Sequence, residues 1–435
     1  MTTNNPLSIT PENVKDERIC YEFYAQSGQK LYLQSNANVT LIYPNQSSEN
    51  LKLTDDGGKD IVLSQTGIYS ISVLDKDIKN GQITISLESN IPSTSSLSNF
   101  PLPSLPSPSI NNYRTGRMRI ITAYDYNQNI YPIYSQLTYQ PLQKPNLQPS
   151  QKLQQIVDDV VIFMDSKGMP TTRLSVSLID LKTSSYAGYS DQEVRFPASV
   201  TKLFWMVYLY GQYQSRLLPE GTIPEKQLKK MIQDSDNEAA SLIVDTITQT
   251  TSSNDLTGSE LQIWIQKRLA MNSFFQQAGY SQINISQKLF PTKQFTEPIG
   301  RDLQIRLDPA DPIRDYATTS DVARLLFEIE AEKSISRKYS KQMKRLLKRS
   351  LHPQDWKNKE FNAIEGFLGE GLPQDAYFAS KMGWNFSVRN DAAIIGSPDR
   401  KHKYILVIFG DDPSFYKDKK LFPEISRMVY QEMTK

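Results

Sequence analysis

The stretch that most constrains the fold of this chain runs from Arg195 to Tyr210. It starts with Arg-Phe-Pro-Ala-Ser-Val-Thr-Lys and continues with the apolar run Leu-Phe-Trp-Met-Val-Tyr-Leu-Tyr. Proline suits the first turn of a helix, where its missing amide hydrogen has no partner to lose. The apolar run is long enough for a core helix and too short to span a membrane. The sequence therefore predicts a loop that leads into a buried helix.

Ser199 and Lys202 lie three positions apart in this stretch, so they share one face of the first helical turn. A serine hydroxyl becomes a good nucleophile only when a base removes its proton, and a lysine can be that base if burial lowers its pKa. The same spacing occurs twice elsewhere in the chain without an apolar helix behind it. Taken alone, the pattern also fits an ordinary helix start with a solvated lysine, so other parts of the chain must decide.

Composition excludes several classes of site. The net charge of +2 predicts neither a nucleic-acid partner nor binding to a membrane surface. Cys20 is the only cysteine, so an intramolecular disulfide and a thiolate metal cage are excluded. His352 and His402 are the only histidines, which leaves no His-rich metal site, and no G-x-S-x-G elbow accompanies them. We expect no metal and no cofactor.

The chain of 435 residues is long enough for two or three domains, and its patterns change along its length. Residues 13–95 alternate apolar and polar positions in short runs broken by turn residues, which predicts an antiparallel β-sandwich. Residues 91–112 are rich in proline and serine, as in an extended linker. The predicted organisation is an accessory β-sandwich domain at 1–95, a linker and connecting segment at 96–147 and an α/β domain at 148–435.

A change of period along the sequence predicts the architecture of the α/β domain. An amphipathic helix at 150–168 and a hairpin at 174–189 precede the apolar stretch, and helical patterns fill 200–350. From 378 the period becomes that of strands, and an amphipathic helix at 419–434 closes the chain. We expect one antiparallel sheet flanked by the first and last helices, with an all-helical insertion.

Two further short motifs change the interpretation of the first. Ser235-Asp236-Asn237 precedes an apolar helix, and Lys381-Met382-Gly383 ends a strand. Singly, the former fits a helix N-cap and the latter an edge-strand lysine. Together with Ser199-x-x-Lys202, in this order and on these elements, they resemble the motifs of the penicillin-recognising serine hydrolases, which include class A β-lactamases and penicillin-binding proteins. The resemblance covers residues 150–435.

The resemblance implies catalytic roles for four side chains. Ser199 is expected to be the nucleophile, and Lys202 its base or proton relay. Ser235 is expected to carry the proton towards a leaving nitrogen. Lys381 is expected to supply positive charge near Ser235 and to help orient a substrate carboxylate.

The resemblance also implies how a substrate is held. Asn237 is expected to hydrogen-bond a substrate amide, whereas Asp236 fixes the loop. The oxyanion hole is expected to consist of the backbone amides of Ser199 and Trp384. Gly383 lets the substrate backbone lie close against the strand.

Three departures from the family pattern bear on function. Class A enzymes deacylate with a glutamate, but residues 284–293 contain no acid, and Glu297 is the first candidate base after them. Ser235 follows Ser199 by 36 positions, fewer than in class A β-lactamases, which favours an open cleft and a larger substrate such as a peptide. A methionine replaces the hydroxyl residue of the third motif, and Trp384 is expected to add an apolar face beside the acyl site.

Residues 13–95 resemble the bacterial pre-peptidase C-terminal type of β-sandwich. The similarity rests on the Gly28-Gln29-Lys30-Leu31 opening, the Leu41-Ile42-Tyr43-Pro44 strand and the Gly67-Ile68-Tyr69 corner. Such modules are accessory. The resemblance therefore implies a spacer or folding companion, or else a module that binds the cell wall or the substrate.

Three functional hypotheses follow. The leading one is a serine acyl-transfer hydrolase that forms an acyl-enzyme on Ser199 with a peptide, amide or β-lactam substrate related to the cell wall. The alternative is a non-catalytic or weakly catalytic scaffold of the same fold, with the N-terminal sandwich as a cell-wall or matrix binding module. A third, a His-dependent esterase, requires His352 or His402 near Ser199.

The same features set the expected partners and compartment. We expect a small-molecule or peptide substrate, with peptidoglycan as a candidate, no nucleic acid, no transmembrane segment and a monomer. The family resemblance implies a periplasmic or secreted protein. The N-terminus has no basic region followed by an apolar one, so we expect either a cytoplasmic protein or an export signal upstream of this chain.

Overall fold

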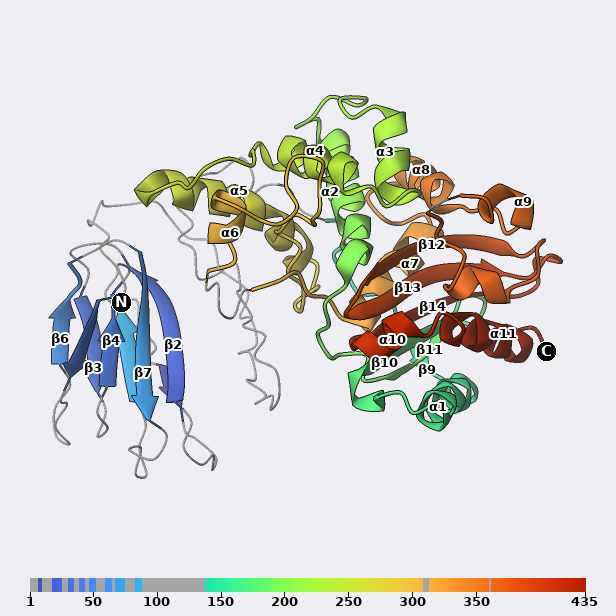
Figure 1. Ribbon diagram of the computed structural model, residues 1–435, viewed down its shortest axis with the longest axis horizontal. Helices are drawn as coiled ribbons and strands as arrows, with labels where there is room; N and C mark the ends of the chain where they lie inside the picture. Colours follow the sequence, from blue (N-terminus) through green and yellow to red (C-terminus); the bar gives the residue numbers. More distant parts are fainter. Residues whose placement is uncertain are drawn as a thin grey trace, which may run out of the picture. The chain divides into compact units, whose positions relative to one another are not determined.

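The computed structural model divides the chain into two compact units, and each is described by itself (Figure 1). The described residues before 88 fall in the first unit, and those from 137 onwards fall in the second. The described residues are 7–9, 18–25, 30–34, 39–43, 47–51, 59–64, 67–74, 83–87, 137, 139–307, 313–359 and 361–435.

The first unit consists of two four-stranded sheets with strand orders β1-β8-β3-β6 and β2-β7-β4-β5, in which all pairs are antiparallel. Its strands are β1 (Leu7–Ile9), β2 (Arg18–Ala25), β3 (Lys30–Gln34), β4 (Val39–Ile42), β5 (Ser48–Leu51), β6 (Lys59–Val62), β7 (Gly67–Leu74) and β8 (Ile83–Leu87). Residues of both sheets, including Leu31, Leu41 and Ile71, form one buried cluster. The predicted antiparallel strands are confirmed, and the likeness to pre-peptidase sandwiches stays a prediction.

The second unit is built on one six-stranded sheet with the order β12-β13-β14-β10-β11-β9. The strands are β9 (Gln148–Pro149), β10 (Leu174–Asp180), β11 (Ser185–Tyr189), β12 (Tyr377–Asn385), β13 (Val388–Gly396) and β14 (Lys403–Gly410). Only the short β9–β11 pair is parallel among these pairings. Strand β14 pairs with β10, so the late strands extend the early hairpin into a single sheet, as the sequence predicts.

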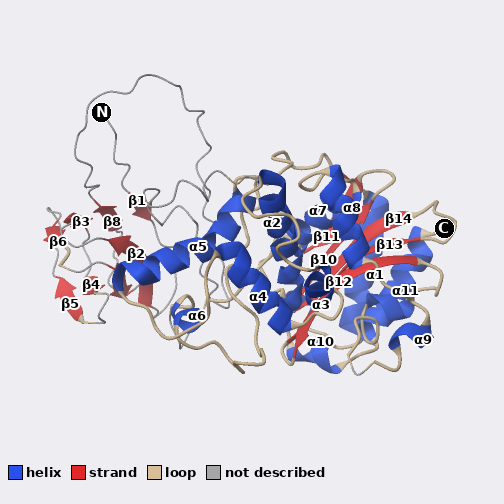
Figure 2. Ribbon diagram, turned by 90° about the horizontal axis from the view of Figure 1, so that it is seen from above, coloured by secondary structure: helices blue, strands red, loops and turns tan. Residues whose placement is uncertain are grey.

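Helices cover both faces of this sheet (Figures 1 and 2). Alternate residues of β14 enter different cores: Val407 belongs to the cluster under α2 and α7, and Leu406 to the cluster under α1 and α11. Because both faces are covered, strands β13 and β14 are apolar and buried along most of their length. The predicted sheet flanked by the first and last helices is confirmed.

The second unit contains the two helices that flank the sheet, α1 and α11, and the helices of the predicted insertion. The helices are α1 (Gln151–Ser166), α2 (Lys202–Ser215), α3 (Glu225–Ile232), α4 (Asn237–Thr248), α5 (Gly258–Gln276), α6 (Arg301–Gln304), α7 (Thr319–Glu330), α8 (Arg337–Leu347), α9 (Pro353–Trp356), α10 (Pro413–Lys417) and α11 (Leu421–Met433), with short 3-10 turns η4 (Thr171–Arg173), η5 (Ala198–Thr201) and η6 (Leu368–Gly371). Every residue of α2 from Lys202 to Tyr213 is buried, because α3, α4, α5 and α8 surround it. Each helix of the described chain is too short or too polar to cross a lipid bilayer.

The core of the second unit includes residues that precede helix α1 in the sequence. Leu137 and Tyr139 are buried in the cluster around α2. The Tyr139 hydroxyl donates a hydrogen bond of 2.6 Å to Glu328, and its ring packs edge-on against Tyr280. The predicted domain start at 148 therefore leaves out two side chains that this core contains.

Candidate active site

Three separate elements bring the sequence motifs together. Ser199 lies in η5, directly before α2; Ser235 lies between α3 and α4; and Lys381 lies on the edge strand β12. Strand β12 runs directly against the serine loop, since a Cβ added to Gly383 would lie 2.4 Å from the Pro197 carbonyl oxygen and 2.8 Å from the Ser199 nitrogen. Only glycine permits this approach.

Lys202 is the centre of the site. Its side chain is fully buried, and its Nζ lies 3.0 Å from Ser199 Oγ, 2.7 Å from Asn237 Oδ1 and 2.6 Å from the Ser235 carbonyl oxygen. Burial lowers the pKa of Lys202 to about 7, and the negative charge of Asp236 opposes the shift in part. A sizeable fraction of this lysine is therefore neutral near neutral pH.

The identity of its neighbours fixes what a neutral Lys202 can do. The carbonyl oxygen of Ser235 and the amide oxygen of Asn237 can only accept hydrogen bonds, so they take the two N–H groups of the amine. Two hydroxyl groups also lie near Nζ, and Ser199 Oγ at 3.0 Å is closer than Ser235 Oγ at 3.4 Å. The lone pair of the neutral amine is thus left for the Ser199 hydroxyl proton, which is the arrangement a general base needs.

Ser235 and Lys381 form the second half of the site. Lys381 Nζ donates hydrogen bonds to Ser235 Oγ at 2.8 Å and to the Met382 carbonyl oxygen at 2.7 Å. Burial holds the pKa of Lys381 well below its usual range, and the neighbouring cations Lys202 and Arg349 lower it further. Because Ser235 Oγ accepts from Lys381, its own hydrogen remains available for another acceptor.

The backbone on both sides of the cleft is held in an uncommon conformation. Ser235 and Ala198 have φ values of 56° and 47°, in the left-handed region that costs non-glycine residues about 1–2 kcal/mol. The loop at Ser235 is fixed by Asp236, which caps α4 by accepting from the Ala239 nitrogen at 2.6 Å. The carboxylate of Asp236 is therefore used for positioning.

Arg349 braces the site from behind, and sequence reasoning missed it. Its guanidinium donates to Ser380 Oγ at 3.0 Å and to the carbonyl oxygens of Gln233 and Ile232 at 3.0 and 2.9 Å. It thereby ties strand β12 to the end of α3, two residues before Ser235. Most of its partners are backbone carbonyls of distant segments, so the sequence carries no signal for it.

The comparison with protein families agrees with this geometry. A model described as the β-lactamase enzyme family matches residues 151–433. The chain belongs to the β-lactamase enzyme family. The comparison with curated proteins found no match.

Several solved structures are similar to this chain. The structure of PBP-A is 18% identical, with a TM-score of 0.45 over 66% of this chain and 98% of that one. A β-lactamase from Sphaerobacter thermophilus DSM 20745 is 16% identical, with a TM-score of 0.46 over 64% and 96%. A class A β-lactamase from Mycobacterium abscessus is 14% identical, with a TM-score of 0.45 over 64% and 100%.

The ring of Trp384 lies elsewhere than the sequence suggested. Side chains alternate along a strand, so Lys381 and Gly383 face the serine loop and Trp384 points to the other face of β12. There its ring stacks between Tyr416 and Phe361, at centroid distances of 5.8 and 6.2 Å. The expected apolar face beside the acyl site is not formed by this ring, and only the backbone amide of Trp384 can serve the oxyanion hole.

The sequence offers Glu297 as the candidate deacylation base. Glu297 is exposed and makes no hydrogen bond or ion pair in the described part of the chain. The one carboxylate that affects the pKa of Lys202 is Asp236, which caps α4. The position of Glu297 thus gives no support to its expected role as a base.

Neither imidazole has a described hydrogen bond to Ser199. His402 lies in the turn between β13 and β14, at the end of the sheet where Tyr377 pairs with Gly396. Tyr377 and Gly383 are six residues apart on β12, or about 20 Å. His352 is exposed at the start of α9. The described partner of the Ser199 hydroxyl is Lys202, which argues against a His-dependent esterase.

Proposed function

We propose that this β-lactamase-family protein is a serine hydrolase that forms an acyl-enzyme on Ser199 with a peptide, amide or β-lactam substrate related to the cell wall. One observation carries the proposal. A buried lysine with a pKa of about 7 has its two N–H groups bound by obligate acceptors and lies 3.0 Å from the serine hydroxyl. This is an activated serine rather than a helix start with a solvated lysine.

The acylation step follows from these contacts. Ser199 Oγ attacks the substrate carbonyl carbon while its proton passes to the neutral amine of Lys202. The oxyanion is stabilised by the backbone amides of Ser199 and Trp384. The carbon–nitrogen bond then breaks as Ser235 Oγ gives its proton to the leaving nitrogen and recovers one from Lys202, 3.4 Å away. The products are an ester on Ser199 and a free amine.

The substrate side of the cleft uses the remaining groups. The amide oxygen of Asn237 is bound by Lys202, so its NH₂ end is the part available to a substrate carbonyl. Lys381 would bind a substrate carboxylate, and that negative charge would in turn favour the ammonium form of Lys381. Binding of a substrate carboxylate would therefore favour the charged form of Lys381, which burial disfavours.

The rate at which the acyl-enzyme is hydrolysed depends on whether a carboxylate can activate water beside Ser199. Hydrolysis of an ester on Ser199 requires a base that activates water, and the described residues place no uncommitted carboxylate beside Lys202. We therefore propose slow deacylation, as in penicillin-binding proteins, rather than the fast turnover of class A β-lactamases. This supports a peptide-processing role in which an amine can take the acyl group.

Intact mass spectrometry tests the proposal directly. Incubation with benzylpenicillin is expected to add one penicilloyl group, which peptide mapping places on Ser199, and Ser199→Ala is expected to stay unmodified. Absence of an adduct, with labelling of a known penicillin-binding protein in parallel, would sink the acyl-enzyme proposal. Sustained hydrolysis of nitrocefin at many turnovers per minute would contradict slow deacylation alone.

A further inference from the structure

Helix α8 presents a wholly basic face to solvent. The helix Arg337–Leu347 contains no acidic residue, and it buries Tyr339, Met343 and Leu347 against the core. On its other side Lys338, Lys341 and Arg345 recur every three or four positions, and Lys348 continues the row. From Lys338 to Arg345 the row spans seven helical positions, or about 10 Å, and Lys348 follows with extended backbone at the end of the helix.

This arrangement lowers the stability of the helix. Like charges three or four residues apart on a helix repel by about 0.2–0.5 kcal/mol per pair, as for Lys341 with Arg345. Basic residues in the first turn are also unfavourable with the helix dipole. Packing does not need these charges, because Arg345 and Lys348 are exposed and their side chains have no hydrogen bond or ion pair with any described residue.

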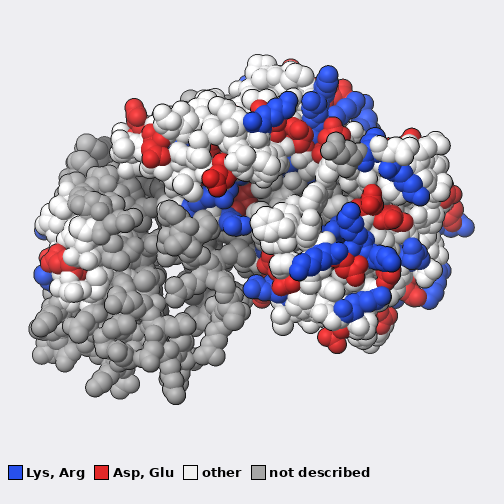
Figure 3. All heavy atoms as spheres, in the orientation of Figure 1, with Lys and Arg blue, Asp and Glu red and all other residues white. Residues whose placement is uncertain are grey.

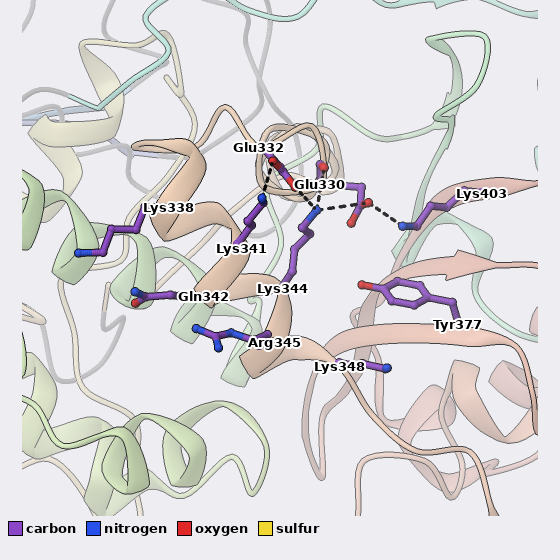
Figure 4. A pocket seen from close by; sticks show the side chains of 10 residues that line it. All are labelled: Glu330, Glu332, Lys338, Lys341, Gln342, Lys344, Arg345, Lys348, Tyr377 and Lys403. Atoms are coloured by element: carbon purple, nitrogen blue, oxygen red, sulfur yellow. Dashed lines mark hydrogen bonds and ion pairs between the residues drawn. The ribbon is translucent and has the colours of Figure 1, made fainter. Parts of the chain in front are cut away.

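The basic row borders an open hollow of about 670 Å³ (Figure 4). Five lysines and Arg345 line it together with two glutamates, Gln342 and Tyr377, so the lining carries a net charge of +4. The whole chain carries only +2. Lys and Arg side chains gather over α3 and α8 on the face that Figure 3 shows. The lining of the hollow is thus net positive, although Glu220 pairs with Lys338 from outside it.

Carboxylates pair with four of the six cations that line the hollow. Glu220, which lies outside the lining, pairs with Lys338 at 2.5 Å. Glu330 pairs with Lys403 at 2.6 Å and with Lys344 at 3.7 Å. Glu332 pairs with Lys344 at 3.2 Å and is 3.9 Å from Lys341. Figure 4 shows these contacts above Arg345 and Lys348, which take no part in them. The cations of the hollow without an ion pair to a described residue are therefore Arg345 and Lys348, and the charge of Arg345 also lowers the pKa of Glu225.

We propose that this hollow binds a linear polyanion with closely spaced charges, in which phosphate or carboxylate groups follow the basic row of α8. A flat bilayer fits it less well, because the lining contains no exposed large hydrophobic residue and Lys403 and Tyr377 form a floor beside the helix. Stacked nucleic-acid bases fit it less well, since the Tyr377 ring is covered by Lys403 Nζ at 4.2 Å.

Strand β12 contributes residues both to the basic hollow and to the candidate acylation site. Tyr377 in the hollow and Gly383 beside Ser199 are six residues apart on β12. Because this number is even, the two positions lie on the same face of the strand. Lys348 pairs with Ala379, and the next residue, Arg349, contacts Ser380. A polymer bound along α8 would therefore be held about 20 Å from Ser199 on the same side of the sheet. The binding itself does not depend on the proposed acyl transfer.

The test is titration of the full chain with end-labelled inorganic polyphosphate, followed by fluorescence anisotropy at several salt concentrations. The variant R345Q/K348Q is expected to bind roughly tenfold more weakly or worse, and its plot of log affinity against log salt to be shallower by about 2. The matched control K152Q/K182Q removes two exposed lysines from α1 and from the β10–β11 turn, and it is expected to bind as the parent does. Thermal melting verifies that each variant is folded.

A variant that removes a negative charge instead of positive ones gives the opposite expected change in affinity. Glu332→Gln removes the acid beside Lys341 and Lys344 and is expected to raise the affinity for polyphosphate. Polygalacturonate in the same assay distinguishes a carboxylate polymer from a phosphate polymer, and binding of either supports the site. The proposal is overturned if neither polymer binds at low salt, if both double variants lose affinity equally, or if duplex DNA or anionic vesicles bind more tightly than both polymers.

Discussion

One buried amine determines what the site can do at the scale of single residues. Spacing alone puts Ser199 and Lys202 on one helical face, but it does not say whether the lysine is charged. The structure shows that burial lowers its pKa and that Ser235 and Asn237 take its hydrogens. Those partners lie more than thirty residues away in sequence.

The titration of Lys202 gives a pH prediction. The neutral amine is the base, and its fraction grows as the pH rises through about 7, so the acylation rate is expected to rise over the same range and then level off. Stopped-flow acylation by a fluorescent penicillin between pH 5 and 9 measures this. Lys202→Met is expected to lose about 10²–10⁴-fold in rate and the pH dependence with it. A parent rate that falls across pH 7 would contradict this assignment.

At the scale of elements, the site depends on how closely β12 approaches η5. The sequence predicts a strand and a helix start, and both are confirmed, but their contact depends on Gly383 and on the brace of Arg349. A motif lysine on an edge strand is solvated in most folds. Here α8 and the Ser235 loop bury it, which no local pattern reveals.

Gly383→Ala tests this contact. The new Cβ would meet the Pro197 carbonyl oxygen at 2.4 Å, so β12 and the serine loop must move apart, at a cost of about 1–3 kcal/mol. We expect a lower melting temperature and slower acylation. Gly396→Ala is the control in the same sheet, because its Cβ would approach the Tyr377 side chain only to 3.3 Å. Equal acylation rates in the two variants would show that the close approach is not needed.

The whole molecule consists of two units, and the second extends further than its sequence pattern suggests. The periodicity and the three motifs predict a hydrolase domain at 148–435, and Leu137 and Tyr139 also belong to its core. Two apolar side chains after a proline-rich segment are too few to show the hydrophobic periodicity of a helix or a strand. The domain boundaries remain predictions that fragments can test.

Fragments 128–435 and 148–435 are expected to differ in stability. The shorter one loses Tyr139, which fills the space beside Phe274 and Tyr280 and donates to the buried Glu328. Loss of a buried aromatic side chain costs about 3–5 kcal/mol. Urea denaturation followed by circular dichroism should give a lower midpoint for 148–435. Equal midpoints would show that the core closes without Tyr139.

The order of helices and strands, the single sheet and the three motifs of the β-lactamase family can be predicted from the sequence, because periodicity and capping are local properties of the chain. Which atoms meet depends on the folded structure. It put the ring of Trp384 on the far face of β12, left Glu297 exposed and collected the basic residues of α8 around one hollow. Hydrogen bonds, burial and pKa depend on segments that are far apart in sequence and adjacent only after folding.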